Sequence, residues 1–390
     1  MKIGITCYPT HGGSGVVATE LGMELARRGH EVHFIAYQVP FRLKPCQDSV
    51  FFHEVQVSSY PLFQYPPYTL ALAAKMAEVA DEAGLDVLHA HYAIPHAICG
   101  YLARQIAKSR KLRLVTTLHG TDITLVGSDQ SFRSLTRFGI DQSDGVTAVS
   151  AFLRRKTIDV FAPDRAIEVI PNFVDTARYS PGREGTIRRE RFAKKGERIL
   201  VHISNFRPSK RVVDVVRTFA AVRREVPSVL LMVGDGSERT RSREVAVELG
   251  VERYVKFLGS MDAVEDVLGV SDLFLLTSEN ESFGLAALEA MSTGVPVIAT
   301  NAEGLPELIR PGVTGYLEAV GDVEAMARRA IEILSDEPKR KAMSEASRRL
   351  AVSDYEASKV VPRYEAFYSR ILEEPPAILP AHLAPPEGLA

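Results

Sequence analysis

Short apolar runs alternate along this chain with longer amphipathic segments, and the alternation limits the possible folds more than any other feature. In the first half the runs are residues 2–7, 31–36, 86–90, 113–118, 145–149 and 167–170. Between the first two, residues 15–29 place apolar side chains at helical spacing and end in a basic turn followed by glycine. Strand, helix and strand repeated in this order predict a parallel sheet with right-handed crossovers.

The same pattern begins again after an irregular stretch at residues 171–195. The second set of apolar runs is 198–205, 229–233, 254–258, 272–277 and 295–299. We therefore expect an α/β protein with two doubly wound, Rossmann-like domains, residues 1–171 and 172–353. Ligands of such sheets bind beyond the carboxyl ends of the strands, so two facing domains predict a site in a central cleft. We expect residues 354–373 to form a helix that packs back toward the first domain, and residues 374–390 to be a flexible, Pro- and Ala-rich tail.

Charge and cysteine content exclude several classes of protein. The chain has 390 residues, with 47 Lys and Arg against 49 Asp and Glu. This balance argues against a general nucleic-acid binder, which needs a basic excess. The cysteines are Cys7, Cys46 and Cys99, with no Cys-x-x-Cys pair, which indicates reduced thiols and a cytoplasmic location. No apolar run approaches the roughly 20 residues of a membrane span, and the N-terminus has the pattern of a strand rather than of a signal peptide.

A glycine-rich turn, Gly12-Gly13-Ser14-Gly15, joins the first apolar run to the first helical segment. Glycines let the backbone approach a ligand closely, and a helix N-terminus offers free N–H groups to an anion. Such a turn can also be only a turn, so from this motif alone both interpretations stay open. A nicotinamide-binding site normally has an acidic residue after the second strand, whereas residues 36–38 are Ala-Tyr-Gln.

Two segments of the second half carry charged residues at the expected carboxyl edge of a sheet. Arg207 and Lys210 follow the run 198–205, where a guanidinium and an ammonium would suit a diphosphate; the alternative is a solvated basic loop. Glu281 stands before a helix that Gly284 opens, and Glu289 lies in its second turn. A helix N-terminus beside two carboxylates favours a site for a ligand with hydroxyl groups, although an N-terminal acid can also simply stabilise its helix.

Histidines mark the expected strand ends of the first half. His119 follows the run 113–118, where an imidazole could hydrogen-bond a reacting sugar, although a lone histidine is more often structural. His89 and His91 resemble a metal pair, but no third ligand accompanies them locally, so structural roles are favoured. Because no Asp-x-Asp occurs, we expect no divalent metal and no other cofactor.

Taken together, these motifs resemble the GT-B retaining glycosyltransferases of family 4. The resemblance spans roughly residues 1–372 and includes the acid-x7-acid spacing of Glu281 and Glu289. Four segments are similar to those of family members that catalyse the first step of bacillithiol biosynthesis: CYPTHGGSGVVATELG, HAHYAIP, TTLHGTDITLVG and SDGVTAVS. The resemblance implies small-molecule substrates: N-acetylglucosamine would pass from UDP-N-acetylglucosamine to the hydroxyl of L-malate, with retention and without a metal. It is also compatible with a homo-oligomer.

The resemblance also implies roles for individual residues. Those expected to act in catalysis are His119, Arg207, Lys210 and Glu281. The donor-binding positions are Gly13, Ser14, Gly15, Asn205, Arg207, Lys210, Gly234, Met261, Glu281, Phe283, Gly284, Leu285 and Glu289. The acceptor positions are Ser14, Tyr92, Thr117 and Arg137, with Arg133 one helical turn away as the alternative partner of a malate carboxylate.

Other functions share part of this pattern. The same fold and donor could serve another acceptor, such as inositol phosphate, but HAHYAIP contains no Lys or Arg to hold a phosphate. A UDP-sugar epimerase shares the two-domain architecture but needs an acid/base set and no acceptor site. A catalytically silent sugar-nucleotide-binding module would not need Arg207, Lys210 and Glu281 together.

Overall fold

The computed structural model describes residues 1–10, 12–43, 48–57, 64–109, 111–127, 129–182 and 187–375. The chain divides into two compact units, which are described separately below. The first unit contains residues 1–171 and the chain from Val360 onward, and the second contains Asn172–Lys359. Most of the predicted tail, from residue 376 on, lies outside the described residues.

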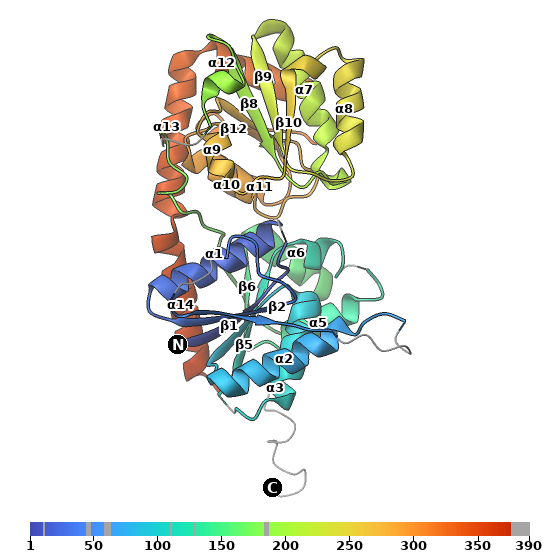
Figure 1. Ribbon diagram of the computed structural model, residues 1–390, viewed down its shortest axis with the longest axis vertical. Coiled ribbons are helices and arrows are strands. Elements are labelled where there is room, and N and C mark those ends of the chain that lie inside the picture. Colours follow the sequence, from blue (N-terminus) through green and yellow to red (C-terminus); the bar gives the residue numbers. More distant parts are fainter. Residues whose placement is uncertain are drawn as a thin grey trace, which may run out of the picture. The chain divides into compact units, whose positions relative to one another are not determined.

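The first unit is built on a seven-stranded parallel sheet with the order β3-β2-β1-β4-β5-β6-β7. Its strands are β1 (Lys2–Thr6), β2 (Glu31–Ala36), β3 (Val50–Glu54), β4 (Val87–His91), β5 (Arg113–Leu118), β6 (Gly145–Ala148) and β7 (Ile167–Val169). Its helices are α1 (Gly13–Arg27), α2 (Tyr68–Ala83), α3 (Ile98–Ile106), α4 (Thr121–Thr124), α5 (Arg133–Asp141) and α6 (Ala151–Phe161), with a π-type turn at Ala93–Ala97. Figure 1 shows α1 on one face of this sheet and α2 and α3 on the other.

The second unit repeats this architecture with a six-stranded parallel sheet of order β10-β9-β8-β11-β12-β13. Its strands are β8 (Arg198–Ile203), β9 (Ser228–Val233), β10 (Val255–Gly259), β11 (Leu273–Leu276), β12 (Val297–Thr300) and β13 (Gly315–Glu318). Its helices are α7 (Val212–Glu225), α8 (Arg239–Glu248), α9 (Val264–Leu268), α10 (Leu285–Ser292), α11 (Leu305–Leu308), α12 (Val323–Ser335) and α13 (Glu337–Asp354). Short 3₁₀ turns lie at Arg189–Arg191, Pro208–Lys210 and Glu252–Tyr254.

Helix α14 (Ala357–Glu373) crosses the boundary between the two units, since residues from Val360 on belong to the first. There the Tyr368 hydroxyl lies 2.7 Å from Nδ1 of His89 in β4. The ring of Phe367 packs so closely on Gly145 of β6 that an added Cβ would lie 2.6 Å from it. The C-terminal helix is therefore part of the first unit's core.

Strand order places the candidate residues at equivalent points of the two sheets. In each sheet the order reverses between two neighbouring strands, β1 and β4 in the first and β8 and β11 in the second. The loops after such strands diverge to opposite faces, which leaves a crevice at the carboxyl edge where ligands of doubly wound sheets bind. The glycine-rich turn follows β1, and His91 ends β4; Arg207 follows β8, and Glu281 follows β11.

The two strands that the sequence pattern missed are β3 and β13. Strand β3 is an edge strand whose residues Val50–Glu54 are exposed or half-buried, and its apolar run is only three residues long before His53 and Glu54. Strand β13 is also an edge strand and only Gly315 is buried in it. Among the described residues no helix is both long enough and apolar enough to cross a membrane.

Candidate functional site

An ion pair joins the two loops at the reversal point of the second sheet. Nζ of Lys210, at the end of the turn after β8, lies 2.6 Å from Oε2 of Glu281, in the loop after β11. The Ser278 hydroxyl also donates to that carboxylate, at 3.3 Å. Both charged side chains are partly buried. The structure therefore brings together two of the predicted catalytic residues, which are 71 positions apart in the sequence.

Backbone contacts hold these two loops in register. The Thr277 hydroxyl lies 2.9 Å from the carbonyl of Lys210 and 3.0 Å from that of Arg211. The Glu279 N–H donates to the carbonyl of Ser209 at 2.8 Å. Because these bonds involve the main chain on both sides of Lys210, its ammonium is held near Glu281 by a fixed frame.

Two further residues of the loop after β8 have unused polar groups. The side chain of Arg207 is exposed and makes no ion pair with any residue the structure describes. Oδ1 of Asn205 is buried and has no hydrogen-bond partner among the described residues. A buried amide oxygen without a donor is costly unless a ligand supplies one. The loop thus offers a free cation and a free acceptor beside the Lys210–Glu281 pair.

The segment after Glu281 turns sharply into helix α10. Gly284 has φ 92°, a backbone conformation that favours glycine, and a Cβ at this position would lie 2.6 Å from the terminal Cδ2 of Leu305. Phe283 is buried with its ring 5.8 Å from that of Tyr355, and Leu285 begins the helix. Glu289 is buried on α10, only 5 % exposed. The glycine turn and the helix N-terminus therefore follow Glu281 directly.

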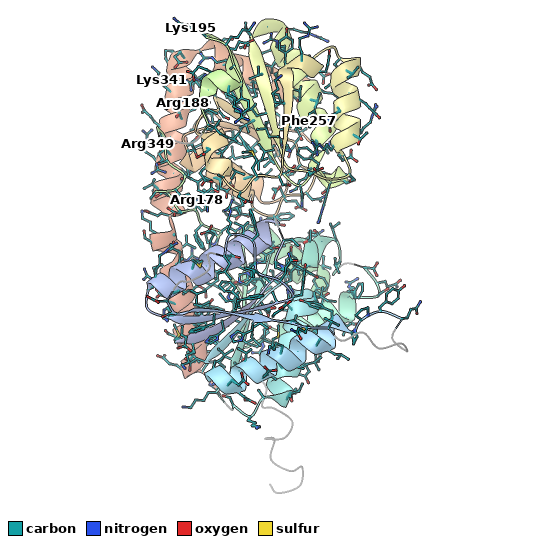
Figure 2. The ribbon with its side chains drawn as sticks, viewed as in Figure 1. Arg178, Arg188, Lys195, Phe257, Lys341 and Arg349 are labelled. Atoms are coloured by element: carbon teal, nitrogen blue, oxygen red, sulfur yellow. The ribbon has the colours of Figure 1, made fainter. Side chains whose placement is uncertain are left out.

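Two predicted donor positions lie at the ends of β9 and β10. Gly234 has φ 122°, and an added Cβ would lie 1.8 Å from the Ser204 carbonyl oxygen, so β9 can reach the loop after β8 only with glycine. Its N–H donates to the carbonyl of Gly259 at 2.8 Å. Met261 follows β10 and is half-buried. Phe257, labelled in Figure 2, belongs to the same strand, and the Arg243 guanidinium lies 5.1 Å from its ring centre.

In the first unit the glycine-rich turn opens helix α1. A Cβ at Gly15 would lie 2.4 Å from the carbonyl oxygen of Tyr8, which explains why this position is glycine. At Gly13 an added Cβ meets nothing within 4 Å. Packing therefore requires glycine at position 15 but not at position 13. Gly13 is exposed, and Ser14 beside it is half-buried. The first N–H groups of α1 have no side-chain cap.

Histidines gather at the carboxyl ends of β4 and β5. Nδ1 of His91 lies 2.9 Å from Nε2 of His119, and the two rings are stacked with centroids 5.1 Å apart. Burial lowers the pKa of His119 and His89 to about 3, and it lowers the pKa of His91 well below its usual value. These imidazoles are therefore neutral at physiological pH. His119 itself is half-buried at the end of β5.

The predicted acceptor residue Tyr92 lies beside His119, with ring centroids 5.4 Å apart. Its backbone has φ 105°, a conformation that costs a non-glycine residue about 1–3 kcal/mol. Two bonds hold it there: its N–H donates to the Thr117 carbonyl at 3.0 Å, and its hydroxyl lies 2.9 Å from that of Thr121. Such strain is typical of functional positions.

The other two acceptor predictions lie in different surroundings. Thr117 is fully buried, and its hydroxyl lies 2.7 Å from Nε2 of His89 and 2.7 Å from the Thr147 hydroxyl. Arg137 is exposed on α5 and pairs with Asp141 and Asp164. Arg133 donates to the Val160 carbonyl. The structure brings Tyr92 and Thr117 together with His119, but it shows Arg137 only with its surface partners, so the carboxylate-binding role remains a prediction.

Asp122 is a residue that the sequence reasoning did not single out. It is buried, and its carboxylate accepts the N–H groups of His119, Gly120 and Ala93 at 3.2, 2.8 and 3.0 Å. Burial nevertheless raises its pKa to about 6. The carboxylate thus ties the loop after β5 to the loop after β4. An acid three residues after a strand-end histidine was the signal available in the sequence.

No group of three or more His, Cys, Asp or Glu within the described ranges could hold a metal ion. The ring nitrogens of His89 instead lie within hydrogen-bond distance of the Tyr368 and Thr117 hydroxyls, and Nδ1 of His91 lies within hydrogen-bond distance of Nε2 of His119. The need for a divalent metal is a question for experiment, and the metal-free reaction stays a prediction.

Comparison with solved structures supports the assignment of the fold. The chain matches the Anabaena protein HepE in complex with UDP-glucose with a TM-score of 0.77 and 22% identity, covering 95% of this chain and 100% of that one. It matches the sucrose-phosphate synthase of Thermosynechococcus elongatus with a TM-score of 0.80 and 18% identity, covering 95% and 99%. At these identities the likeness concerns the fold alone, and it confirms the predicted GT-B architecture.

Sequence comparison identifies the family as well as the fold. Residues 11–178 match the model described as Glycosyltransferase Family 4, and residues 184–350 match Glycosyl transferases group 1. The chain is 51% identical to the N-acetyl-alpha-D-glucosaminyl L-malate synthase of Bacillus anthracis over 374 residues, 96% of this chain and 98% of that protein. It is 30% identical to a D-inositol 3-phosphate glycosyltransferase of Actinosynnema mirum, over 79% of this chain and 80% of that one. The predicted resemblance is confirmed: the chain belongs to glycosyltransferase family 4 and is a sugar-transferring enzyme.

Proposed function

We propose that the protein transfers N-acetylglucosamine from UDP-N-acetylglucosamine to the hydroxyl of L-malate, giving N-acetylglucosaminyl malate and UDP, as the first step of bacillithiol biosynthesis. The observation that carries this proposal is the 51% identity over nearly the full length of both chains to a relative whose name states that product. Relatives that act on inositol phosphate match at 28–30% over less of the chain.

In this proposal the second unit supplies most of the groups that bind the donor. Lys210 and Arg207 offset the negative charge that develops on the UDP diphosphate as the sugar leaves. Arg207 is suited to this role because it is exposed and has no competing ion pair in the described part of the chain. Glu281 and the Gly284 turn hold sugar hydroxyls, and Glu289 binds the ribose. Charge already balanced in the Lys210–Glu281 pair limits the cost of keeping both groups partly buried.

The stereochemistry in this proposal is taken from the resemblance to retaining glycosyltransferases. The available carboxylates bear only on whether a covalent intermediate forms. Glu281 is engaged by Lys210, and Asp122 by three backbone N–H groups. Neither is a free nucleophile, so we assign no covalent glycosyl-enzyme intermediate. The malate hydroxyl attacks the anomeric carbon on the face from which UDP departs, a donor phosphate oxygen takes its proton, and the configuration is retained.

The proposal also covers the metal requirement, the compartment and the oligomeric state of the enzyme. The reaction needs no divalent metal, because Lys210 and Arg207 supply the positive charge. It takes place in the cytoplasm, a reducing compartment that fits the free, buried thiols of Cys7 and Cys99. Self-association into a homo-oligomer is compatible with the proposal, and light scattering of the purified chain would measure it.

The acceptor panel is the direct test. The protein is incubated with UDP-N-acetylglucosamine and, in separate reactions, L-malate, inositol phosphate or water alone, and the UDP released is measured. We expect release to depend on L-malate and the product to carry an α-linkage by NMR. Release that is insensitive to malate would refute the acceptor, and stimulation by inositol phosphate would favour the alternative acceptor. Activity lost in EDTA and restored by Mg²⁺ would contradict the metal-free mechanism.

A further inference from the structure

Behind the half-buried His119 lies a cluster of fully buried histidines that the proposed chemistry does not use. His89, His91 and His96 are each 0% exposed. His91 is the member that touches His119, through the 2.9 Å contact between Nδ1 and Nε2. One of these two nitrogens must carry the shared proton, and which of them does so decides what His119 presents on its other side.

The unpartnered ring nitrogens of the cluster show where the protons are. Nδ1 of His96 lies 2.6 Å from the His91 carbonyl oxygen, which can only accept, so His96 carries its proton on Nδ1. Its Nε2 is buried without a partner among the described residues and is therefore a bare lone pair. Nε2 of His91 is buried and unpartnered in the same way.

The same reasoning applies to His91. A buried N–H without an acceptor is rarer and more costly than a buried lone pair without a donor. The proton of His91 is therefore on Nδ1, which donates to Nε2 of His119. Burial keeps both rings neutral, since it lowers the pKa of each far below 6.5. Neutral His119, accepting at Nε2, must carry its own proton on Nδ1.

We propose that His91 is a positioning residue that selects the Nδ1–H tautomer of His119, so that His119 presents one neutral N–H donor to an oxygen of the bound sugar. His119 Nδ1 makes no hydrogen bond within the described part of the chain, so it is free for this role. The stacked His91 ring and the nearby Tyr92 ring fix the plane of His119. Asp122 fixes its backbone. The contact with sugar rests on the proposed function, whereas the tautomer does not.

The tautomer can be measured without substrate. Two-bond ¹H–¹⁵N spectra of the ¹⁵N-histidine-labelled full chain distinguish Nδ1–H from Nε2–H imidazoles, and the spectrum of His119→Gln identifies the signal of His119. We expect His119 in the Nδ1–H form, unchanged between pH 6 and pH 8, and a shift toward the Nε2–H form in His91→Leu. An Nε2–H tautomer of His119 in the unsubstituted protein would overturn the proposal whether or not the enzyme acts on malate.

Kinetics with three variants separates positioning from packing. His91→Asn keeps an N–H donor close to the place of Nδ1, whereas His91→Leu keeps bulk without a donor. The control is His33→Leu, which removes a buried histidine from β2 whose ring nitrogens contact His53 and Glu31 instead.

We expect kcat/KM for the donor to fall about tenfold in His91→Leu, the value of one neutral hydrogen bond. We expect it to stay within about threefold of the unsubstituted enzyme in His91→Asn and in His33→Leu. Equal losses in the Asn and Leu variants would mean that His91 acts only through packing. If His91→Leu does not fold, the proposal is still tested by the tautomer of His119 in the unsubstituted protein and by the activity of His91→Asn.

Discussion

The two units of this enzyme are built alike but carry opposite kinds of chemistry at the carboxyl edges of their sheets. In the second unit the reversal point holds the Lys210–Glu281 ion pair and the exposed Arg207. In the first unit the same point holds neutral, buried imidazoles beside Tyr92. Cations suit a diphosphate, and neutral single donors suit hydroxyl groups, so the difference shows that one fold, used twice, can present different chemistry at the same point of its sheet.

The largest effect is expected from breaking the charged pair. Lys210→Ala and Glu281→Ala should each lower kcat by about 10²–10³, because each removes a group that stabilises transition-state charge or holds the sugar. The double variant should lose little more than the worse single variant, since residues that act as a unit are not additive. Steady-state UDP release measures all three.

The matched control for these variants is Arg217→Ala. Arg217 also pairs with a carboxylate, Asp214, at 3.2 Å, but it lies on the exposed side of α7. Its loss should leave kcat within about twofold of normal, because the Arg217 guanidinium is half in solvent and the buried Asp214 keeps a second cation, Arg211. Near-normal turnover in Lys210→Ala, with circular dichroism unchanged, would refute the assigned role of the pair.

A smaller effect is expected at Arg207. Arg207→Ala should raise the KM for the UDP-sugar and weaken inhibition by UDP, each by about 10–100-fold, because a hydrogen bond to a charged group is lost. Arg207→Lys keeps the charge without the planar guanidinium. Its KM and its inhibition by UDP should lie between those of the unsubstituted enzyme and those of Arg207→Ala. If neither variant changes UDP inhibition, the exposed guanidinium does not contact the diphosphate.

In the glycine-rich turn of the first unit, alanine variants of Gly15 and Gly13 can separate a structural role from a role in ligand binding. Gly15→Ala should destabilise the protein by about 1–3 kcal/mol, since the added methyl would overlap the Tyr8 carbonyl. Gly13→Ala has room and should leave the urea midpoint unchanged or slightly raised. If Gly13 contacts substrate, its variant should lose about tenfold in kcat/KM despite normal stability. Full activity in Gly13→Ala would show that Gly13 has no role in substrate binding.

The smallest effect is a difference in acid sensitivity between the two units. Burial lowers the pKa of His89 and His119 to about 3 and that of His96 to about 4, against 6.5 in an unfolded chain. The unfolded state therefore binds more protons below pH 6.5, and stability is lost as the pH falls from 6.5 toward 4. Asp122, whose pKa is raised to about 6, acts in the opposite direction, but it is one group against four, because burial lowers the pKa of His91 as well.

Hydrogen exchange of individual peptides can locate this loss. In the second unit burial also lowers the pKa of His202 to about 4, but it is the one histidine of β8–β13 so affected among the described residues. At pH 5 relative to pH 8, corrected for intrinsic exchange rates, protection should fall more in β4 and β5 than in β8 and β11. Equal losses in both sheets would contradict the view that the neutral histidines set the acid sensitivity.

The sequence predicted most of the central strands because their apolar runs are continuous. Strand β5 runs over Arg113–Leu118 as expected, and β2 over Glu31–Ala36. The edge strand β3 was missed because none of its residues is buried and its apolar run is short. At the site, Arg207, Lys210 and Glu281 were found because charged residues directly after a buried strand stand out. Asp122 was missed because an acid three residues after a strand-end histidine does not by itself show that its carboxylate accepts backbone N–H groups.

Sequence alone therefore determined the order of strands and helices, the repetition of a doubly wound domain and the family, since each depends on residues close together in the chain. The tertiary structure decided which distant residues meet. It pairs Lys210 with Glu281, 71 positions away, and His91 with His119, 28 positions away. It also decided which ring nitrogens are buried without a partner. Burial and proton position depend on neighbours contributed by other strands, and the order of those strands in a sheet exists only once the chain has folded.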